Sequence, residues 1–479
     1  MVLNVNGDII EGNDGGIYRR TSRTDNTGDW FSLIGSLQIS EFHDIAWDTN
    51  SDIIIAGAQD TGTHQQLSSG ATVWDSVSTA DGGDVDVDVL TLAGVSQSIR
   101  YSSSQALGGF RREVYDATGA QVGARVTLIP DGGLPGFVGQ FVTPIAVNAV
   151  PAPGGQSTRL VICGGTSATA GITVGAVYES VDAGLAPNNN AVTWVQVPTG
   201  AGFTAVNRVA LAYGGYSEGV GNPEVMYVAS GGQVYLRTTA GGTLNQTAAQ
   251  PGAGTIVDIV LDPSEWNTAY VIDTNQVFET RDTGASWTDV TGNLAGEAGN
   301  FRTIEYIEGA QDKIVVGTDA GVFAAVEPHF DCWFELGSAL PNASVWDLDY
   351  DAADDLLLAG TLGRGAWTLN DVSLLSTPHL TVPGDVHFED TCVGDMSVGT
   401  LPVCNTGFEN LFILDITTSD PQFTVTEPIG GYPVVVSPDF CFPFQVLFQP
   451  TSEGLQSATI TIESNAPCHE RIEFEVSGY

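Results

Sequence analysis

Residues 312–323 read DKIVVGTDAGVF, which is an apolar run rich in β-branched residues, a small turn, and a second apolar run. This pattern predicts a two-strand hairpin, because β-branched residues favour strands and Gly, Thr and Asp favour tight turns. The same form recurs as DIIEGNDGGIY (8–18), DIIIAGAQDTGTH (52–64), EVMYVASGGQVY (224–235), TAYVIDTNQVF (268–278) and DLLLAGTLGRGAW (355–367). A hairpin repeated along the chain indicates a repeat architecture.

Two further strands flank the hairpins. Upstream, a strand of the form Asp-apolar-x-apolar-Asp occurs as DIAWD (44–48), DIVLD (258–262) and DLDYD (347–351), and DVDVD (84–88) is related to it. Downstream, a short run begins at a tryptophan, at Trp30, Trp74, Trp194, Trp287 and Trp333. Four antiparallel strands in each unit of about 45 residues are typical of a β-propeller. The sequence therefore predicts an all-β fold with a propeller in residues 1–371.

The number of blades follows from counting the repeat units. Six complete units lie between residues 39 and 343, a unit without its first strand occupies 1–38, and a unit without its fourth strand occupies 344–371. Eight blades with incomplete end blades is the simplest count. A seven-bladed ring with spare strands, or a larger ring of which this is a part, stays open.

The repeat stops after Asp371. A proline-containing linker (372–380) leads to residues 381–479, where about seven short strands alternate with turn residues. Strands at this spacing predict a second domain that is an immunoglobulin-like β-sandwich.

Composition excludes several classes of partner. The 479 residues include 15 basic and 57 acidic side chains, which give a net charge of −42. Such a chain cannot neutralise the phosphates of a nucleic acid or bind an anionic membrane surface. No apolar stretch is long enough for a membrane helix, and no signal peptide precedes the repeat. The charge favours a soluble monomer, and both ends read as cuts within a longer multidomain chain.

Four of the six cysteines, Cys392, Cys404, Cys441 and Cys468, lie in the last hundred residues. They allow two disulfides in three connectivities, and their spacing contains no CxxC pair of the kind that zinc sites use. At least one disulfide is expected, and with it an extracellular or cell-surface location.

The segment TRDTGASW (280–287) matches the Asp-box pattern Ser/Thr-x-Asp-x-Gly-x-Thr-Trp, with Ser in place of Thr. Thr280, Asp282, Gly284, Ser286 and Trp287 are expected to close a turn on the outer rim, a structural role. Asp282 would accept backbone N–H groups, Gly284 would supply a positive φ, and Trp287 would anchor the turn. Degenerate copies occur at 22–30 and 180–194.

Together with the phrases IEGNDGGIYRRTS, AGAQDTGT and LPNASVWDLDYDAADDLLLAGTLGRGAWTLN, these boxes resemble the BNR-repeat propellers. That group includes sialidases, xyloglucanase-type glycoside hydrolases and sortilin-type receptors. The stretches VHFEDTCVGDMSVGTLPVCNTGFENLFI and FCFPFQVLFQPTSEGLQSATITIESNAP resemble ASH/Hydin-type immunoglobulin-like modules, which serve as spacers in bacterial surface and secreted proteins. The Phe/Tyr-Arg-Ile-Pro motif that carries one arginine of the sialidase triad does not occur in this sequence.

Candidate site residues are acids expected at the mouth of the channel: Asp14, Asp60 in the pair Gln59–Asp60, and Asp84 in the segment Asp81–Asp84. Each could simply cap a turn, and each could instead belong to a catalytic pair. Alternation places Asp84, Asp86 and Asp88 on one face of a strand, where carboxylates could hold Ca²⁺. Apart from calcium, no cofactor is expected. His43 and Asp44 are neighbours on a strand and so point to opposite faces, which argues against a catalytic pair.

Two hypotheses about function follow. The first is a non-catalytic, exported binding or scaffold protein whose propeller engages a glycan, a peptide or another surface protein. The alternative is a carbohydrate-active enzyme, a glycoside hydrolase or lyase, that uses carboxylates at the channel mouth.

Overall fold

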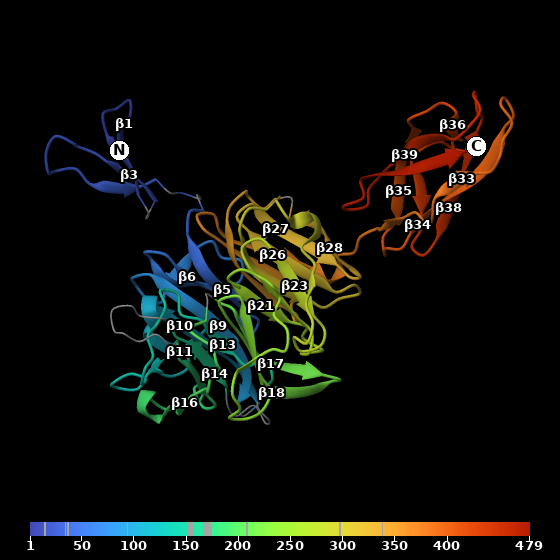
Figure 1. Ribbon diagram of the computed structural model, residues 1–479. Coiled ribbons are helices and arrows are strands. Elements are labelled where there is room, and N and C mark those ends of the chain that lie inside the picture. The colour runs from blue at the N-terminus through green and yellow to red at the C-terminus, as the bar shows by residue number, and fades with distance from the viewer. Residues whose placement is uncertain are drawn as a thin grey trace. The chain divides into compact units, whose positions relative to one another are not determined.

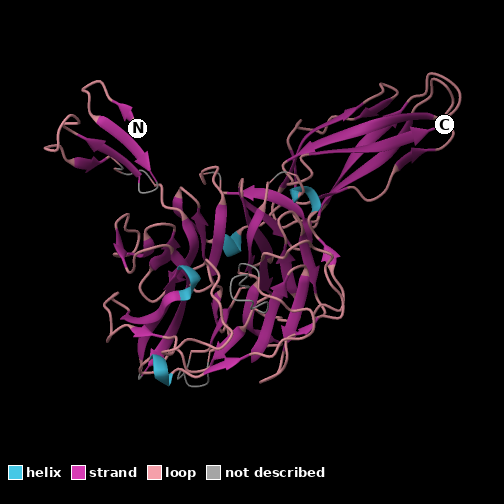
Figure 2. Ribbon diagram, turned by 60° about the vertical axis from the view of Figure 1, so that its left-hand side comes forward, coloured by secondary structure: helices cyan, strands magenta, loops and turns pink. Residues whose placement is uncertain are grey.

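The computed structural model describes all residues except 14–15, 34, 36–37, 93, 152–157, 166–174, 207–208, 297 and 338. The described chain is built almost wholly from strands, as Figure 2 shows. Its described residues also form four short 3-10 helices. These helices are η1 (Gln105–Leu107), η2 (Asn189–Ala191), η3 (Gly292–Leu294) and η4 (Val372–Leu374). None of the helices in the described part of the chain is long and apolar enough to cross a bilayer.

Contacts divide the chain into two compact units. The first contains residues 1–308, 312–324 and 335–373, and the second contains 309–311, 325–334 and 374–479. The linker predicted at 372–380 thus begins next to the division after Ser373. The short pieces 309–311 and 325–334, which belong to the second unit, were assigned to the propeller in the sequence analysis.

The first unit consists of antiparallel sheets that follow one another along the chain, each with its strands in sequence order (Figure 1). The N-terminal sheet contains β1 (Val2–Leu3), β2 (Ile9–Asn13), β3 (Gly16–Arg20) and β4 (Trp30–Ser32). Blades one to three contain β5 (Phe42–Asp48), β6 (Ile53–Ala58), β7 (Gly62–Gln66) and β8 (Trp74–Ser76); β9 (Gly82–Leu92), β10 (Val95–Ser104), β11 (Gly108–Asp116) and β12 (Val126–Thr127); and β13 (Ile145–Val147), β14 (Leu160–Cys163), β15 (Val177–Ser180) and β16 (Trp194–Gln196).

Blades four to six are also four-stranded, and blade seven has three strands. They contain β17 (Leu211–Ser217), β18 (Val220–Ser230), β19 (Gln233–Arg237) and β20 (Asn245–Gln246); β21 (Asp258–Leu261), β22 (Ala269–Ile272), β23 (Val277–Thr280) and β24 (Thr288–Asp289); β25 (Phe301–Ile307), β26 (Lys313–Thr318), β27 (Gly321–Val326) and β28 (His329–Leu336); and β29 (Val345–Asp351), β30 (Leu356–Thr361) and β31 (Gly365–Asn370). The six complete units and the incomplete last unit predicted from the sequence are confirmed.

The ring contains seven blades. The first strands of successive blades contact one another in the order β5, β9, β13, β17, β21, β25, β29, and β29 returns to β5. The simplest sequence count of eight is therefore corrected to the smaller alternative. The N-terminal repeat does fold into a four-stranded sheet, and β1 is the first strand that the sequence pattern did not predict. However, the contact between β29 and β5 closes the ring without this sheet, and a repeat pattern cannot reveal where a ring closes.

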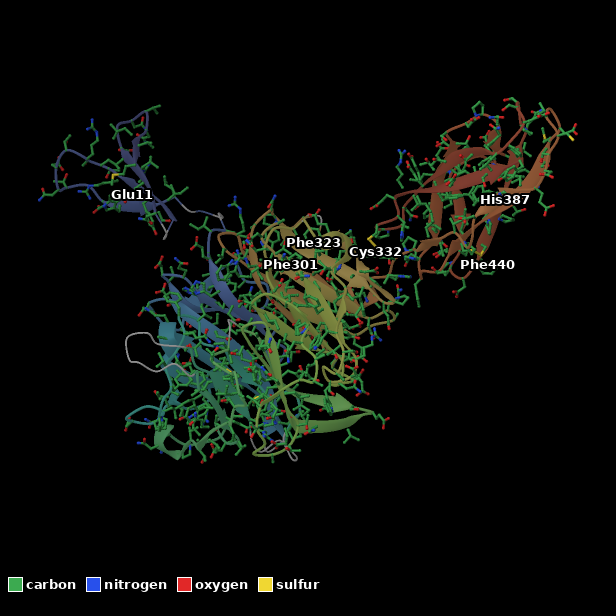
Figure 3. All side chains as sticks on the ribbon, viewed as in Figure 1. Glu11, Phe301, Phe323, Cys332, His387 and Phe440 are labelled. Carbon is green, nitrogen blue, oxygen red and sulfur yellow. A yellow bond between two sulfur atoms is a disulfide. The ribbon has the colours of Figure 1, made fainter. Side chains whose placement is uncertain are left out.

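Buried apolar residues pack between adjacent blades of the ring. Figure 3 labels one buried apolar residue, Phe301, at the start of β25. One cluster joins blades three to five, with Met226, Tyr227 and Tyr235 among its fully buried members. Burial of this kind contributes about 1.5–3 kcal/mol for each large apolar side chain. A second cluster joins blades two and three around Tyr101 and Phe110.

The main body of the second unit is a sandwich of two sheets, as predicted. One sheet has the order β32-β34-β38-β36 and the other has the order β33-β40-β39-β35-β37. Their strands are β32 (Leu380–Thr381), β33 (Val386–Phe388), β34 (Ser397–Asn405), β35 (Leu411–Thr418), β36 (Phe423–Val425), β37 (Val434–Val436), β38 (Cys441–Phe448), β39 (Gln456–Ser464) and β40 (Arg471–Gly478). The two inner faces enclose a core that includes Phe423, Phe444 and Phe448.

Two disulfides lie in the second unit. Cys404 pairs with Cys441 across β34 and β38, and Cys332, labelled in Figure 3, pairs with Cys468. Cys392 is exposed and free, and Cys163 is buried and free. Three of the four predicted cysteines are therefore paired, and the partner of Cys468 is Cys332, which lies far from it in the sequence.

Candidate functional site

Carboxylates of the first strands line the middle of the ring. We call Asp44, Asp84, Asp86, Asp258, Asp347 and Asp349 the carboxylate belt. Asp44 Oδ2 accepts the backbone N–H of Val85 at 2.7 Å, and Asp84 Oδ2 accepts that of Ile145 at 3.0 Å. Such bonds satisfy the free N–H groups along the edge strand of the next blade, which would otherwise be buried without a partner.

The remaining belt residues make the same kind of bond between adjacent blades. Backbone N–H groups donate to Asp86 from Val147 at 2.6 Å, to Asp258 from Ile304 at 2.8 Å, to Asp347 from Ile45 at 2.9 Å, and to Asp349 from Trp47 at 2.7 Å. Alternate residues of one strand meet alternate residues of the next in the same order, so these first strands run parallel. The carboxylates of the Asp-apolar-x-apolar-Asp pattern thus join adjacent blades.

Burial and mutual repulsion control the protonation of the belt. Burial raises the pKa values of Asp44, Asp84 and Asp347 well above their usual range, and the proximity of these carboxyls to one another adds to the rise. Burial also raises the pKa of Asp86 to about 7 and that of Asp349 to about 6. Part of the belt is therefore protonated near neutral pH, which reduces the repulsion within it.

Asp84, Asp86 and Asp88, the residues of the calcium hypothesis, lie in or next to the belt. Asp84 and Asp86 already accept backbone N–H groups, and burial raises the pKa of Asp88 as well. Among the residues that the structure describes, no three His, Cys, Asp or Glu side chains are arranged to hold a metal ion. The alternation that suggested a cation site also serves contacts between blades, and the calcium site stays a prediction.

A group of aromatic and charged side chains lies where the first strands begin. We call His43, Phe141, Arg302, Asp319 and Trp346 the mouth cluster. The His43 ring lies 5.9 Å from the Phe141 ring and 6.2 Å from the Trp346 ring, measured between centroids. The Arg302 guanidinium lies 5.2 Å from the centre of the Trp346 ring, within cation–π range.

The positions in this cluster are fixed by hydrogen bonds. Arg302 binds Asp319 through two N–H···O bonds of 2.8 and 2.9 Å, and His43 Nδ1 lies 3.1 Å from the carbonyl oxygen of Gly82. Burial opposes ionisation of Asp319, but hydrogen bonds from Arg302, Ser344 and Asn300 hold its pKa well below the usual range. Phe141, in contrast, exposes 56% of its surface. The mouth cluster is therefore a fixed aromatic and ionic surface with one open ring.

Most of this cluster was not predicted from the sequence. His43 was considered only as a partner of Asp44, and the structure places His43 against Gly82 while Asp44 binds Val85. A signal did exist, because His43 and Trp346 both stand immediately before the first Asp of the strand pattern. No such pattern marks Phe141 or Arg302.

The predicted catalytic candidates are not brought together. Asp14 lies outside the described residues. Asp60 lines a groove of about 1050 Å³ between blades one and seven, where its N–H donates to Asp81 Oδ1 at 2.9 Å. Asp84 lies in the carboxylate belt. Glu41 is the other acid that lines this blade-seven groove, and the Glu41 carbonyl accepts the N–H of Gln59.

The Asp box forms the predicted turn between β23 and β24. Asp282 accepts the N–H of Ser286 at 2.8 Å and the Ser286 hydroxyl at 2.6 Å, and these bonds lower its pKa. Gly284 has φ +77°, and its N–H donates to the Thr280 hydroxyl at 2.9 Å. The Trp287 indole N–H donates to the carbonyl of Ala249 at 3.3 Å. These bonds join residues of the box to one another and to Ala249, in the segment between β20 and β21.

No family model matches the chain, and no curated protein matches it in sequence. Among solved structures, a crystal structure of the GH74 enzyme of Niastella koreensis is similar, with a TM-score of 0.44 and 15% sequence identity. The similarity covers 75% of this chain and 47% of that enzyme, so the chain spans about half of its length.

Proposed function

We propose that this chain is a non-catalytic, exported or cell-surface binding protein that holds a neutral glycan at the mouth of the propeller channel. The observation that carries the proposal is the exposed Phe141 ring, which contacts His43 beside the Arg302–Trp346 pair. Aromatic faces bind the apolar faces of sugar rings, and nearby polar groups fix their orientation. A net charge of −42 disfavours anionic glycans.

Export is supported by the two disulfides, because such bonds persist in oxidising compartments. A non-catalytic role is supported by the carboxylate belt, whose acids bind backbone N–H groups of neighbouring blades and have raised pKa values. Acids held in this way are poorly placed to attack a substrate.

The alternative, a glycoside hydrolase, is favoured by one observation. Glu41 and Asp60 both line the blade-seven groove, and hydrolysis of a glycosidic bond needs two carboxylates. If the chain is a hydrolase, the release of reducing sugar should be lost in Glu41→Gln and in Asp60→Asn.

The test is a panel of neutral oligosaccharides examined by calorimetry and by assays for released sugar. We expect binding without turnover, weakened at least tenfold by Phe141→Ala and by Trp346→Ala. Phe440→Ala is the matched control, because Phe440 is an exposed aromatic of the second unit (66% exposed). Equal binding by the wild type and Phe141→Ala would contradict the proposal, and sustained turnover would favour the alternative.

A further inference from the structure

The seventh blade lacks the outer strand that every other blade of the ring has. β31 pairs with β30, and no other strand in the described part of the chain pairs with it. The blade-seven groove lies along this open edge, where Ala366, Thr368 and Asn370 line it. An open edge next to a groove is a place where an extended segment can add to a sheet.

The complete blades show which features a fourth strand at the open edge of β31 would have. The fourth strands β8 and β16 begin with Trp74 and Trp194, and Trp287 stands directly before β24. The Trp194 indole N–H donates to the carbonyl of Leu128 at 3.0 Å, and that of Trp287 donates to Ala249 at 3.3 Å. Leu128 and Ala249 each follow the fourth strand of the preceding blade.

The corresponding tryptophan of blade one is Trp74, and the preceding blade is blade seven. Trp74 lines the blade-seven groove, and within the described residues its indole N–H has no hydrogen-bond partner. Its counterparts in blades three and five bind a carbonyl that a fourth strand carries into position. The groove therefore occupies the place of a missing fourth strand.

The chain contains a strand with the required sequence. β4 begins at Trp30 and contains Phe31, and Leu33 follows its last residue, Ser32; Trp30, Phe31 and Leu33 are 45%, 45% and 44% exposed. β4 also precedes the first strand of blade one, as a closing strand must. Ser40, between them, accepts the N–H groups of Gly363 and Gly365 at 3.1 Å, so this connection already lies at the start of β31.

We propose that residues Trp30–Leu33 add to β31 as the fourth strand of blade seven, within the same chain. The register follows from blade one, where Gln65 faces Asp75 and Gln66 faces Trp74. By the same alignment Thr368 faces Phe31 and Leu369 faces Trp30. Because Thr368 lines the groove, Phe31 enters it beside Trp74. The stretch from Trp30 to Phe42 is longer than that from Trp74 to Gly82, so the connection is long enough.

In this arrangement β31 replaces β3 as the partner of β4. In the structure β4 pairs with β3, with Arg19 opposite Phe31 and Arg20 opposite Trp30, and each guanidinium lies over the facing aromatic ring. Pairing with β31 satisfies the open edge of blade seven in place of the edge of β3, and it removes Phe31 and Leu33 from water, which favours the exchange. It also covers Glu41 and Asp60, so it bears on the hydrolase alternative and leaves the mouth cluster open.

Two double-cysteine variants, each carrying Cys392→Ser, distinguish the two pairings. Phe31→Cys with Thr368→Cys reports the proposed pairing, and Phe31→Cys with Arg19→Cys reports the pairing with β3. After mild oxidation, we expect peptide mapping to find the first disulfide within single chains in most molecules. A disulfide in the second variant alone would overturn the proposal. A Phe31–Thr368 crosslink between two chains would overturn it as well, and would show a strand exchanged between copies.

Hydrogen exchange provides a measurement that needs no engineered disulfide. Phe31→Asp should displace β4 from β31. Amide exchange across Gly365–Asn370 should then become about tenfold faster than in the wild type. The matching strand of blade one, Gly62–Gln66, is the internal control and should not change. Exchange at Gly365–Asn370 that is equally fast in both proteins would overturn the proposal.

Discussion

Asp347 and Ile45 lie 302 positions apart in the sequence, yet Asp347 Oδ2 accepts the Ile45 backbone N–H at 2.9 Å. This bond joins the first strand of blade seven to that of blade one, and Asp349 with Trp47 repeats it two residues further along. Because blades one and seven are the ends of the ring, these two bonds contribute to its closure, together with the bonds that Asp354 accepts from Trp47 and Thr49.

Replacing Asp347 should therefore destabilise the ring. In Asp347→Ala the Ile45 N–H is left buried without its acceptor, which costs about 1–3 kcal/mol. The measurement is the free energy of unfolding in urea. Asp385→Ala, which removes an exposed acid of the second unit, controls for the loss of one negative charge. Equal stability of the two variants would show that this bond does not hold the closure.

The stability of the propeller should fall as the pH rises from about 5 to 8. Asp86 and Asp349, with pKa values raised to about 7 and about 6, retain protons in the folded chain that the unfolded chain releases near pH 4. Their contribution is fully present below about pH 4 and is lost as the pH rises through 6 and 7. Glu179 behaves oppositely, because hydrogen bonds from Arg237 and Tyr213 outweigh its burial and lower its pKa to about 2. The contribution of Glu179 to the stability is lost only at acidic pH, below the range from pH 5 to 8.

The measurement is the melting temperature at constant ionic strength. We expect it to be several degrees higher at pH 5 than at pH 8, and we expect Asp86→Asn to reduce the difference. A melting temperature that rises over this range in the wild type would contradict the role assigned to the belt.

The sequence predicted those parts of the fold that repeat. Hairpin turns, tryptophan-led outer strands and the Asp box each depend on residues near one another in the chain, so short patterns identify them. Closure depends on Asp347 meeting Ile45, and no local pattern indicates which two blades meet. The spacing of the cysteines did not predict the disulfide of Cys468 for the same reason. Cys468 pairs with Cys332, which lies 136 positions away in the sequence.

The candidate site was less predictable than the fold. Asp84 was singled out because carboxylates on one face of a strand suggest a cation site. In the structure, the Asp84 carboxylate accepts a backbone N–H from the neighbouring strand. Phe141 and Arg302 come from different blades and converge only when the ring forms. The strand pattern explains the belt once the adjacent blade is known, since each carboxylate needs a partner outside its own sheet.

Calcium should affect stability no more than sodium does. Asp84 and Asp86 are engaged by backbone N–H groups, so millimolar Ca²⁺ should act through screening of the net charge alone. We expect melting curves in CaCl₂ and in NaCl of matched ionic strength to coincide. A specific rise in CaCl₂ that Asp84→Asn abolishes would contradict this expectation and support a calcium site.

The cysteines should differ in reactivity. Treatment of the native, unreduced protein with an alkylating reagent should modify Cys392, which is exposed and free, and should leave Cys163 unmodified. Burial protects Cys163 and raises its pKa, so it carries little thiolate. Denaturation without reductant should make Cys163 reactive while the four paired cysteines stay protected. Peptide mapping that finds Cys404 or Cys441 alkylated under these conditions would contradict the pairing.

The Asp box should contribute to stability and not to ligand binding. A Cβ atom at Gly284 would lie 2.5 Å from Thr247 Cβ, and φ there is +77°, so Gly284→Val should cost about 2–4 kcal/mol. Gly241→Val is the matched control, because Gly241 also has a positive φ but no atom within 4 Å of the added Cβ, which isolates the backbone strain from the clash. Trp287→Ala should cost about 2 kcal/mol, since the half-buried ring leaves a cavity and the Ala249 carbonyl loses its donor. Urea unfolding measures these differences, and calorimetry of the folded variants should give the wild-type affinity for any glycan that binds. Loss of binding by a normally folded Gly284→Val would place the ligand at the rim and contradict a site at the mouth cluster.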